Sequence, residues 1–443
     1  MWNMNLCQRT VLLFALVLVS HGAIQQTTAK PHPNFFQHII QIFKDALYSF
    51  MKGYGVDPEI FMDANEMITS KGYPCEDHQV ITEDGYILTM QRIPHGRNTN
   101  SSIGDRPVVI LQHGLLGEST NYLDNLANES LAYILADAGA DVWLSNSRGN
   151  TYSRAHTHLK PSQVAFWDWS FDEMARFDLP AVVDYVLAES GQSQVTYVGH
   201  SQGTTIGFAG FSQNQTLASK IKLFVALAPV AKVAHIGGPY KYFGPFAYDL
   251  EFFTNLFGLG QFQPTTEFDK FMASDVCPHF TQLCTNLFFL HKGGAYNTLN
   301  ESRVPVYVAH NPAGTSTKNM VHFAQAIKTD TFQKYDYNSG EKNILHYGQP
   351  TPPAYHPENM TVPVVVFRGG DDWLSDHEDI EWLLPKLQNL IYDKNIDHWE
   401  HIDFIFGLDA PELCYSVIVD LMFNKSGTLL SNQSNGNNTI SVP

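Results

Sequence analysis

The chain has 443 residues, of which 44% are hydrophobic and 16% are charged, a balance that suits a packed globular protein and excludes an intrinsically disordered one. Its 44 acidic side chains outnumber its 27 basic ones, for a formal net charge of −17. There is no run of lysine or arginine, so we expect no binding to nucleic acid. The 19 histidines would cancel most of this charge between pH 7 and pH 5, because the ordinary pKa of histidine is about 6.5.

The first 23 residues are typical of a secretory signal peptide. Arg9 precedes the apolar run Val11–Val19, and the small residues that follow suit cleavage after Gly22 or Ala23. The run is shorter than the roughly 20 apolar residues of a membrane-spanning helix, and no second run of this kind follows, so we expect no transmembrane anchor. The chain is therefore predicted to enter the secretory pathway and to be secreted, with the lysosome as the alternative.

Cysteines and sequons agree with this route. Cys7 would leave with the signal peptide, and Cys277 and Cys284, which are close in sequence, are predicted to form a disulfide. Cys75 and Cys414 could form a second bridge or remain buried thiols. Eight N-x-S/T sequons occur, and glycans on surface loops are predicted at several of them. The predicted glycosylation sites are Asn100, Asn128, Asn214, Asn300, Asn359 and Asn424.

Along the chain, residues 24–56 are predicted to form a flexible leader and an amphipathic helix, Asn34–Lys52, that packs on the body. From residue 57 apolar strands alternate with helices, which predicts a mostly parallel sheet covered on both faces, and Glu83-Asp84-Gly85 is typical of a hairpin turn. The predicted strands are Gln79–Thr82, Tyr86–Ile93, Val108–Gln112, Val142–Ser145, Val195–Gly199, Leu223–Ala228, Val364–Arg368 and Leu390–Asp393. The predicted helices are Leu123–Gly139, Phe171–Ser190, Gln202–Phe211, Trp373–Leu387 and Pro411–Phe423.

The alternation stops between residues 231 and 361, a stretch rich in phenylalanine, glycine and proline. We interpret it as a cap inserted between two parts of one core, 57–230 and 362–426, and we expect residues 427–443 to form a flexible tail. Seven aromatic residues between Phe243 and Phe262 could be the core of this cap or a lid over an acyl-binding crevice.

The segment Gly199-His200-Ser201-Gln202-Gly203 has the G-x-S-x-G form and lies between a predicted strand and a predicted helix, as a nucleophile elbow requires. The two glycines permit a sharp turn that lifts the Ser201 hydroxyl above the sheet. The N-terminus of the following helix favours a developing anion. Ser201 is therefore the predicted nucleophile.

Such a serine needs an acid and then a histidine later in the chain. Asp371 and Asp372 follow the end of one predicted strand, and His401 lies in the loop after the next. We predict that His401 exchanges a proton with Ser201 and that Asp372 orients its imidazole. Asp371 and His398 are the local alternatives.

The other half of an oxyanion hole is expected after the strand Val108–Gln112. Gly114 in His113-Gly114-Leu115-Leu116-Gly117 permits a backbone amide to face the site, and the amide of Gln202 supplies a second donor. His113 is expected to brace this loop. No zinc, phosphate-loop or dinucleotide motif occurs, and His156-Thr157-His158 is a weak pair, so we expect no metal and no cofactor.

Several segments together resemble the acid lipase family of gastric and lysosomal acid lipases, over roughly Asp57–Asn424. The segments are Leu111–Leu116, Asn146–Asn150, Val198–Thr205, Asn311–Ser316 and Glu400–Phe404. The resemblance implies an α/β-hydrolase core with an inserted lid, and hydrolysis of triacylglycerols or sterol esters. It places the nucleophile, acid and base of the family on Ser201, Asp372 and His401, and its oxyanion donors on Leu115 and Gln202.

The sequence thus predicts a serine esterase or lipase that hydrolyses neutral lipids at a lipid–water interface through an acyl-enzyme. The alternative is a non-catalytic lipid-binding or adhesion protein on the same fold. Dead versions of such a fold lose a triad residue, and all three are present here, which favours the enzyme. The sequence carries no signal for an oligomeric state.

Overall fold

The computed structural model describes residues 56–97, 106–238, 260–262, 267–278, 284 and 298–423. Apart from Val56, these residues belong to one structural unit, Asp57–Pro443. The predicted signal peptide, leader, amphipathic helix and tail lie outside the described residues, as do most of the aromatic residues of the predicted lid. No helix in the described part of the chain is long and apolar enough to cross a membrane.

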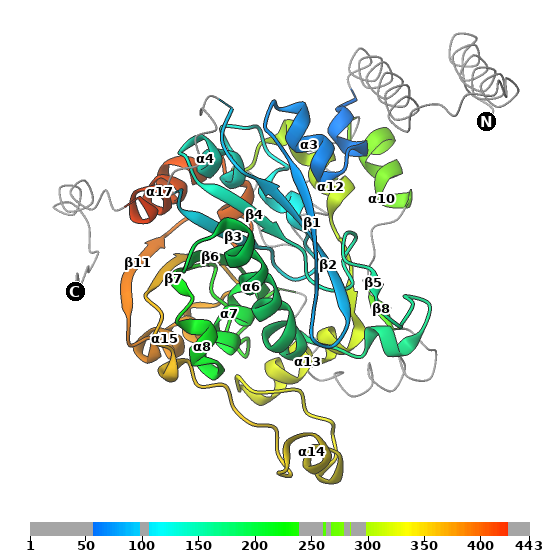
Figure 1. The fold of residues 1–443 in the computed structure, drawn as a ribbon, viewed down its shortest axis with the longest axis vertical. Coiled ribbons are helices and arrows are strands. Elements are labelled where there is room, and N and C mark those ends of the chain that lie inside the picture. Colours follow the sequence, from blue (N-terminus) through cyan, green and yellow to red (C-terminus); the bar gives the residue numbers. More distant parts are fainter. Residues whose placement is uncertain are drawn as a thin grey trace, which may run out of the picture. The chain divides into compact units, whose positions relative to one another are not determined.

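Nine strands of the described residues form one sheet, in the order β1-β2-β4-β3-β6-β7-β10-β11, with the short β5 paired to β2 (Figure 1). The strands are β1 (Glu76–Ile81), β2 (Tyr86–Ile93), β3 (Val108–Gln112), β4 (Asp141–Ser145), β5 (Ala155–His156), β6 (Val195–His200), β7 (Ile221–Leu227), β10 (Val364–Gly369) and β11 (Leu390–Ile396). Pairs from β4 to β11 are parallel, and β1, β2 and β5 pair antiparallel. The predicted mostly parallel sheet is confirmed, as is the hairpin turn, where Gly85 has φ 95°.

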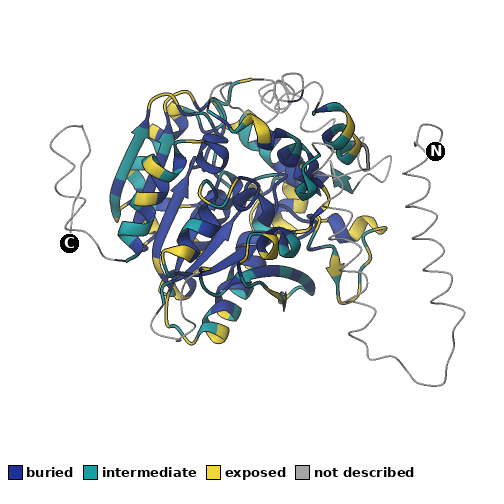
Figure 2. Cartoon of the chain, turned by 90° about the horizontal axis from the view of Figure 1, so that it is seen from above, coloured by how far each residue is buried: buried dark blue, intermediate teal, exposed yellow. Residues whose placement is uncertain are grey.

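The sheet is buried because its central strands are apolar on both faces. All residues of β3, β4 and β6 are buried (Figure 2). Alternate residues such as Ile110, Tyr197 and Phe224 pack in one core with α6 (Leu179–Ser190) and α7 (Gln202–Gln213). Other helices of the first part are α3 (Ala64–Ser70), α4 (Leu131–Asp137), α5 (Phe171–Glu173) and α8 (Gln215–Ala218).

Between β7 and β10 the described residues add no strand to this sheet. They form helices and a separate two-stranded sheet of β8 (Gln261–Phe262) and β9 (Thr315–Ser316). The helices are α10 (Glu267–Phe271), α12 (Val304–His310), α13 (Thr317–Thr329) and α14 (Gly340–Tyr347). The predicted break in the alternation is thus present, while the boundaries of a cap at 231 and 361 stay a prediction.

In two of the predicted helices the first residues form a loop instead. Leu123–Gly139 is helical only in α4, because Asn125 is held in a loop by bonds to the Phe406 carbonyl and to Tyr307. Trp373–Leu387 begins as α15 at His377, after Asp376 caps its first turn. The last helices are α15 (His377–Leu383), α16 (Asp403–Phe406) and α17 (Ser416–Met422).

Candidate active site

Ser201 lies at the sharp turn between β6 and α7. Its backbone has φ 54° and ψ −121°, a conformation that non-glycine residues rarely adopt and that is typical of functional sites. Its N–H donates to the carbonyl of Leu227 on β7 at 3.0 Å. Glycine is needed on both sides, because a Cβ on Gly199 would lie 2.7 Å from the Gly203 carbonyl and one on Gly203 would lie 2.4 Å from the Gln112 oxygen.

His401 and Asp372 come together at the ends of the last two strands. The Nδ1 of His401 lies 3.0 Å and 3.2 Å from the two carboxylate oxygens of Asp372. One of these oxygens also accepts the N–H groups of Leu374 and Ser375, at 2.9 and 2.8 Å, so the carboxylate has a fixed orientation. Both side chains are almost fully buried, which strengthens their interaction relative to one in water.

The two local alternatives face elsewhere. Asp371 is exposed, whereas Asp372 is buried. The imidazole of His398 is 59% exposed and pairs with Asp409 at 3.0 Å. The structure therefore pairs Asp372 with His401 and leaves Asp371 and His398 outside this pair.

The loop after β3 lies directly against the serine. A Cβ on Gly114 would come within 2.9 Å of the Ser201 Cβ, so only glycine permits this approach. The loop then turns through Leu116, which has φ 60°. Leu115 lines the same cavity as Ser201, and Gln202 occupies the first position of α7, where its N–H has no intrahelical acceptor.

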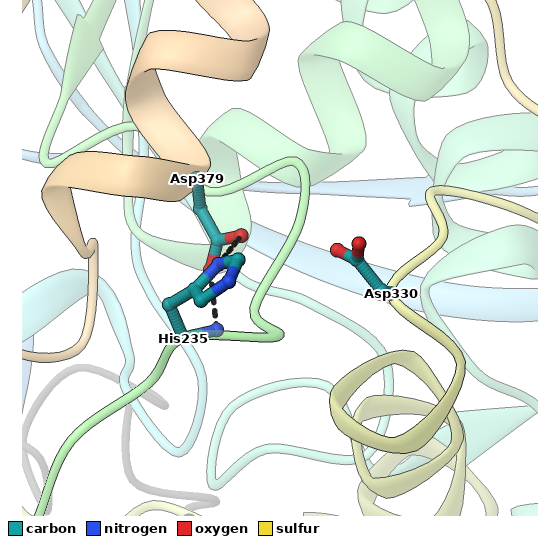
Figure 3. Close-up of side chains that lie close together, drawn as sticks. All are labelled: His235, Asp330 and Asp379. Carbon is teal, nitrogen blue, oxygen red and sulfur yellow. Dashed lines mark hydrogen bonds and ion pairs between the residues drawn. The ribbon is translucent and has the colours of Figure 1, made fainter.

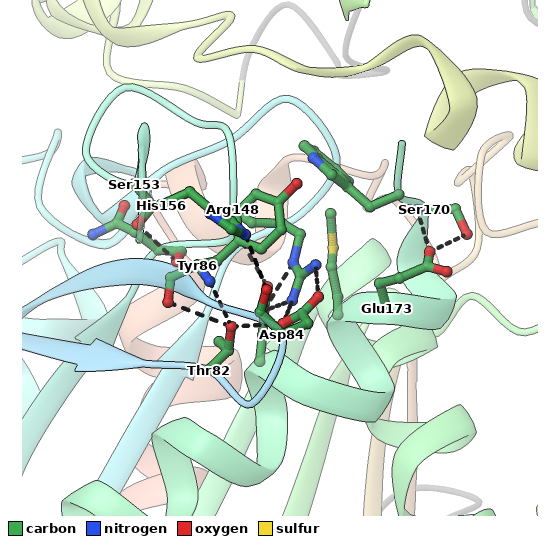
Figure 4. A network of polar contacts seen from close by, with 12 residues as sticks. Thr82, Asp84, Tyr86, Arg148, Ser153, His156, Ser170 and Glu173 are labelled. Carbon is green, nitrogen blue, oxygen red and sulfur yellow. Dashed lines mark hydrogen bonds and ion pairs between the residues drawn. The ribbon is translucent and has the colours of Figure 1, made fainter. Parts of the chain in front are cut away.

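His113 braces this loop, as predicted. Its Nδ1 donates to the Gly114 carbonyl at 2.8 Å, and its Nε2 accepts the N–H of Ser147 at 3.0 Å. The neighbouring Arg148 is fully buried and bonds to Asp84 at 2.7 Å and to Asp178 at 2.6 Å (Figure 4). The loop beside Ser201 thus rests on a buried ion-pair network.

A cavity of about 140 Å³ contains Ser201 and His401 in its wall. One face of α13 supplies Met320, Phe323, Ala324 and Ile327, whose spacing places them on one side of the helix. The other apolar lining residues are Leu115, Leu116, Val230, Val233, Ile236, Phe262, Leu374, Ile402, Ile405 and Phe406. Such a lining suits an apolar ligand that meets a few polar groups at the serine.

Comparisons with known proteins agree with this geometry. The sequence profile described as "alpha/beta hydrolase fold" matches residues 107–408, and that described as "Partial alpha/beta-hydrolase lipase region" matches residues 64–126. Gastric triacylglycerol lipase of Rattus norvegicus is 48% identical over 389 residues, which cover 87% of this chain and 97% of that protein. Lysosomal acid lipase/cholesteryl ester hydrolase of Homo sapiens is 51% identical over 369 residues, which cover 83% and 92%. The chain belongs to the acid lipase family. It is a serine lipase of the α/β-hydrolase fold, as its sequence predicts.

Two further contacts hold the loop that carries His401 in this acid lipase. The Nε2 of His200 donates to the backbone carbonyl of His401 at 2.9 Å and so ties the elbow to the histidine loop. Asp403 accepts the N–H of Glu400 at 2.7 Å and holds the turn that carries His401. Burial raises the pKa of Asp403 to about 7. Both residues lie in segments that match the family, Asp403 in Glu400–Phe404 and His200 in Val198–Thr205, but the sequence does not give their contacts.

Among the described residues one group could offer three ligand atoms to a metal, His235, Asp330 and Asp379 (Figure 3). The imidazole and backbone N–H of His235 bond to Asp379 at 2.9 and 3.0 Å, and Asp330 pairs with Lys232. The hydrogen bond to Asp379 raises the pKa of His235. Because both carboxylates already face cations of the chain, we interpret the group as an ion-pair cluster that ties the segment after β7 to α15, and assign it no metal.

Cys277 and Cys284 form a disulfide, whereas Cys75 and Cys414 are free thiols. Among the predicted glycosylation sites, Asn128, Asn214 and Asn359 are exposed. Asn300 is half-buried, and its side chain donates to Glu129 at 2.9 Å. Asn100 and Asn424 lie outside the described residues.

Proposed function

We propose that this lipase hydrolyses carboxylic esters through a covalent intermediate on Ser201. The Oγ of Ser201 attacks the ester carbonyl while the Nε2 of His401 takes its proton, and Asp372 holds the imidazole and stabilises its cation. The N–H groups of Leu115 and Gln202 donate to the carbonyl oxygen as it becomes negative. His401 then protonates the leaving alcohol, and a water molecule, activated by the same histidine, releases the acid.

The observation that carries this proposal is that Ser201, at its turn, and His401, paired with the buried Asp372, line one cavity. The proposed oxyanion loop also comes close to this serine, at Gly114. A loop histidine or an incidental carboxylate would not be expected to have all these contacts together.

The substrates that we propose are neutral lipid esters, triacylglycerols or sterol esters, presented at a lipid–water interface. The apolar lining of the cavity supports this class, because each methylene of an acyl chain that leaves water gains about 0.8 kcal/mol. The printed names of the two relatives, triacylglycerol lipase and cholesteryl ester hydrolase, support the same class. Relatives named for the stomach and the lysosome support a place in the secretory pathway, and we propose secretion after removal of residues 1–23.

The decisive experiment compares Ser201→Ala with Ser212→Ala, a buried serine of α7 away from the cavity. We expect Ser201→Ala to abolish ester hydrolysis and covalent labelling by an organophosphate, and Ser212→Ala to retain both. Hydrolysis by Ser201→Ala at the wild-type rate would refute the mechanism. A panel of triacylglycerols and sterol esters at pH 5 and pH 8 then identifies the preferred substrate.

A further inference from the structure

The segment Asn311–Ser316 matches the acid lipase family, and none of its residues takes part in the proposed chemical steps. It precedes α13, and it contacts the loop of the proposed oxyanion donor Leu115. The N–H of Ala313 donates to the carbonyl of Leu116 at 2.9 Å, and Asn311 accepts a hydrogen bond from Asn121 at 2.9 Å. One side of the oxyanion hole is thus held from this segment.

The other side is held by Asn319, in the first turn of α13. Its side chain is fully buried, and its Nδ2 donates to the Oε1 of Gln202 at 2.6 Å and to the hydroxyl of Thr315 at 3.1 Å. Its Oδ1 accepts the N–H of Phe171 at 2.9 Å. This last contact fixes which end of the amide is oxygen, because a backbone N–H can only donate.

Gln202 is the residue whose backbone N–H we assign to the oxyanion hole. Its side chain is buried, and its Nε2 contacts the sulfur of Met174 at 3.6 Å, a weak interaction beside the 2.6 Å bond from Asn319. The rare backbone conformation of the preceding Ser201 persists only where surrounding contacts determine it. A strong hydrogen bond on the next side chain is such a contact.

We propose that Asn319 is a positioning residue for ester hydrolysis, which holds Gln202 so that its N–H points at the developing oxyanion. The inference rests on the proposed function of Gln202 and extends it to a residue 117 positions away. Ser316 completes the arrangement, because its hydroxyl accepts the N–H of Asn319 and donates to the Trp169 carbonyl. One segment, 311–319, therefore aligns both proposed donors.

The test uses Asn319→Leu, which removes the hydrogen bonds at similar volume, and Gln202→Met, which removes the same bond from its other end. The matched control is Gln325→Met, also on α13, because Gln325 is a buried amide with bonds of 2.7 and 2.9 Å to the backbone of Asp336. The full chain is assayed on a soluble short-chain ester and with a trifluoromethyl ketone, which forms a tetrahedral adduct with the serine.

Removal of an oxyanion donor lowers kcat by about 10²–10³, so we expect misalignment by Asn319→Leu to lower kcat by about 10- to 100-fold with KM nearly unchanged. Affinity for the ketone should fall by the same factor. Gln325→Met should keep the wild-type kcat. The double variant Asn319→Leu/Gln202→Met should be no slower than the slower single variant, because both changes break one contact.

A wild-type kcat in Asn319→Leu, or multiplicative losses in the double variant, would overturn the positioning role. If Asn319→Leu does not fold, Gln202→Met decides alone, and a wild-type kcat in it overturns the proposal. Ser201→Ala in the same panel distinguishes failure of the serine mechanism from failure of the role of Asn319. Turnover without Ser201 refutes the mechanism. Turnover that needs Ser201 but is unchanged by Asn319→Leu refutes only the positioning role.

Discussion

Asp124 provides a test of how burial alters the pH dependence of stability. It is fully buried in the loop after β3, and within the described residues neither carboxylate oxygen has a hydrogen-bond partner. Burial, with the charges of Glu118 and Glu59, raises its pKa to about 7, against the opposing charges of His310 and Arg303. The folded protein therefore holds a proton on Asp124 at a pH where the unfolded chain has lost it.

This difference in protonation determines whether stability rises or falls with pH. Stability from the protonated group is fully present below about pH 4 and is lost as the pH rises to about 7. A shift of about three pKa units corresponds to about 4 kcal/mol, at 1.36 kcal/mol per unit. His310 changes stability with pH in the same direction as Asp124. Burial acts to lower the pKa of His310, but the hydrogen bond to Glu118 and the charge of Asp124 outweigh burial and raise this pKa to about 9. His322 acts oppositely, because burial lowers its pKa to about 3.

The Asp124→Asn variant removes the titration of Asp124 and also its charge, which contributes to the raised pKa of His310. Urea unfolding of wild type and variant at pH 4 and pH 8 should show the variant gaining about 4 kcal/mol relative to wild type between the two pH values. Asp137→Asn is the control. Burial acts to raise the pKa of Asp137, but hydrogen bonds from Tyr73 and Arg97 outweigh burial and lower this pKa. The stability of Asp137→Asn relative to wild type should therefore not increase as the pH rises. A stability difference for Asp124→Asn that does not change with pH would refute the reasoning.

Three further predictions concern the site and the ion pairs beside it. Asp372→Asn should lower kcat by a factor on the order of 10⁴, since the histidine loses its charge partner and tautomer, whereas Asp371→Asn should stay near wild type; the opposite ranking would overturn the assignment. Gly114→Ala should lower kcat on the order of 100-fold, because its Cβ would meet that of Ser201 at 2.9 Å; unchanged steady-state kinetics would contradict this. Arg148→Met should lower the free energy of unfolding by about 3–5 kcal/mol, measured by urea unfolding, because it leaves the buried carboxylate of Asp178 unpaired, and a loss below 1 kcal/mol would argue against it.

The sequence predicts the elements of this site well where the signal is local. Ser201 is recognisable because its glycines, strand and helix are adjacent in the chain. Asp372 is recognisable because it comes shortly after the end of a predicted strand. The choice between Asp371 and Asp372 depends on which side chain turns inward, and here the family resemblance agrees with the burial seen in the structure. The pairing of Cys277 with Cys284 is likewise a short-range prediction.

Prediction from the sequence fails where residues far apart in the chain determine the local structure or the role of a side chain. The helix expected from Leu123 starts only at Leu131, since Asn125 bonds to Phe406, 281 residues away. Asn319 carries no pattern that would single it out, because its role comes from three partners on separate elements. A single asparagine has the same sequence signal whether it is exposed or fully bonded in a core.

The loop after β3 contains both Asp124 and residues that lie beside Ser201. It passes Ser201 at Gly114 and reaches Asp124 ten residues later, and α12 and the segment after it contact this loop at several points. Ala313 donates to the Leu116 carbonyl, His310 lies 3.6 Å from Glu118, and Arg303 donates to the Asp124 carbonyl at 2.7 Å. Asp124 therefore lies in the same loop as the proposed oxyanion donor Leu115, and we expect its ionisation to act on the segments that hold this loop.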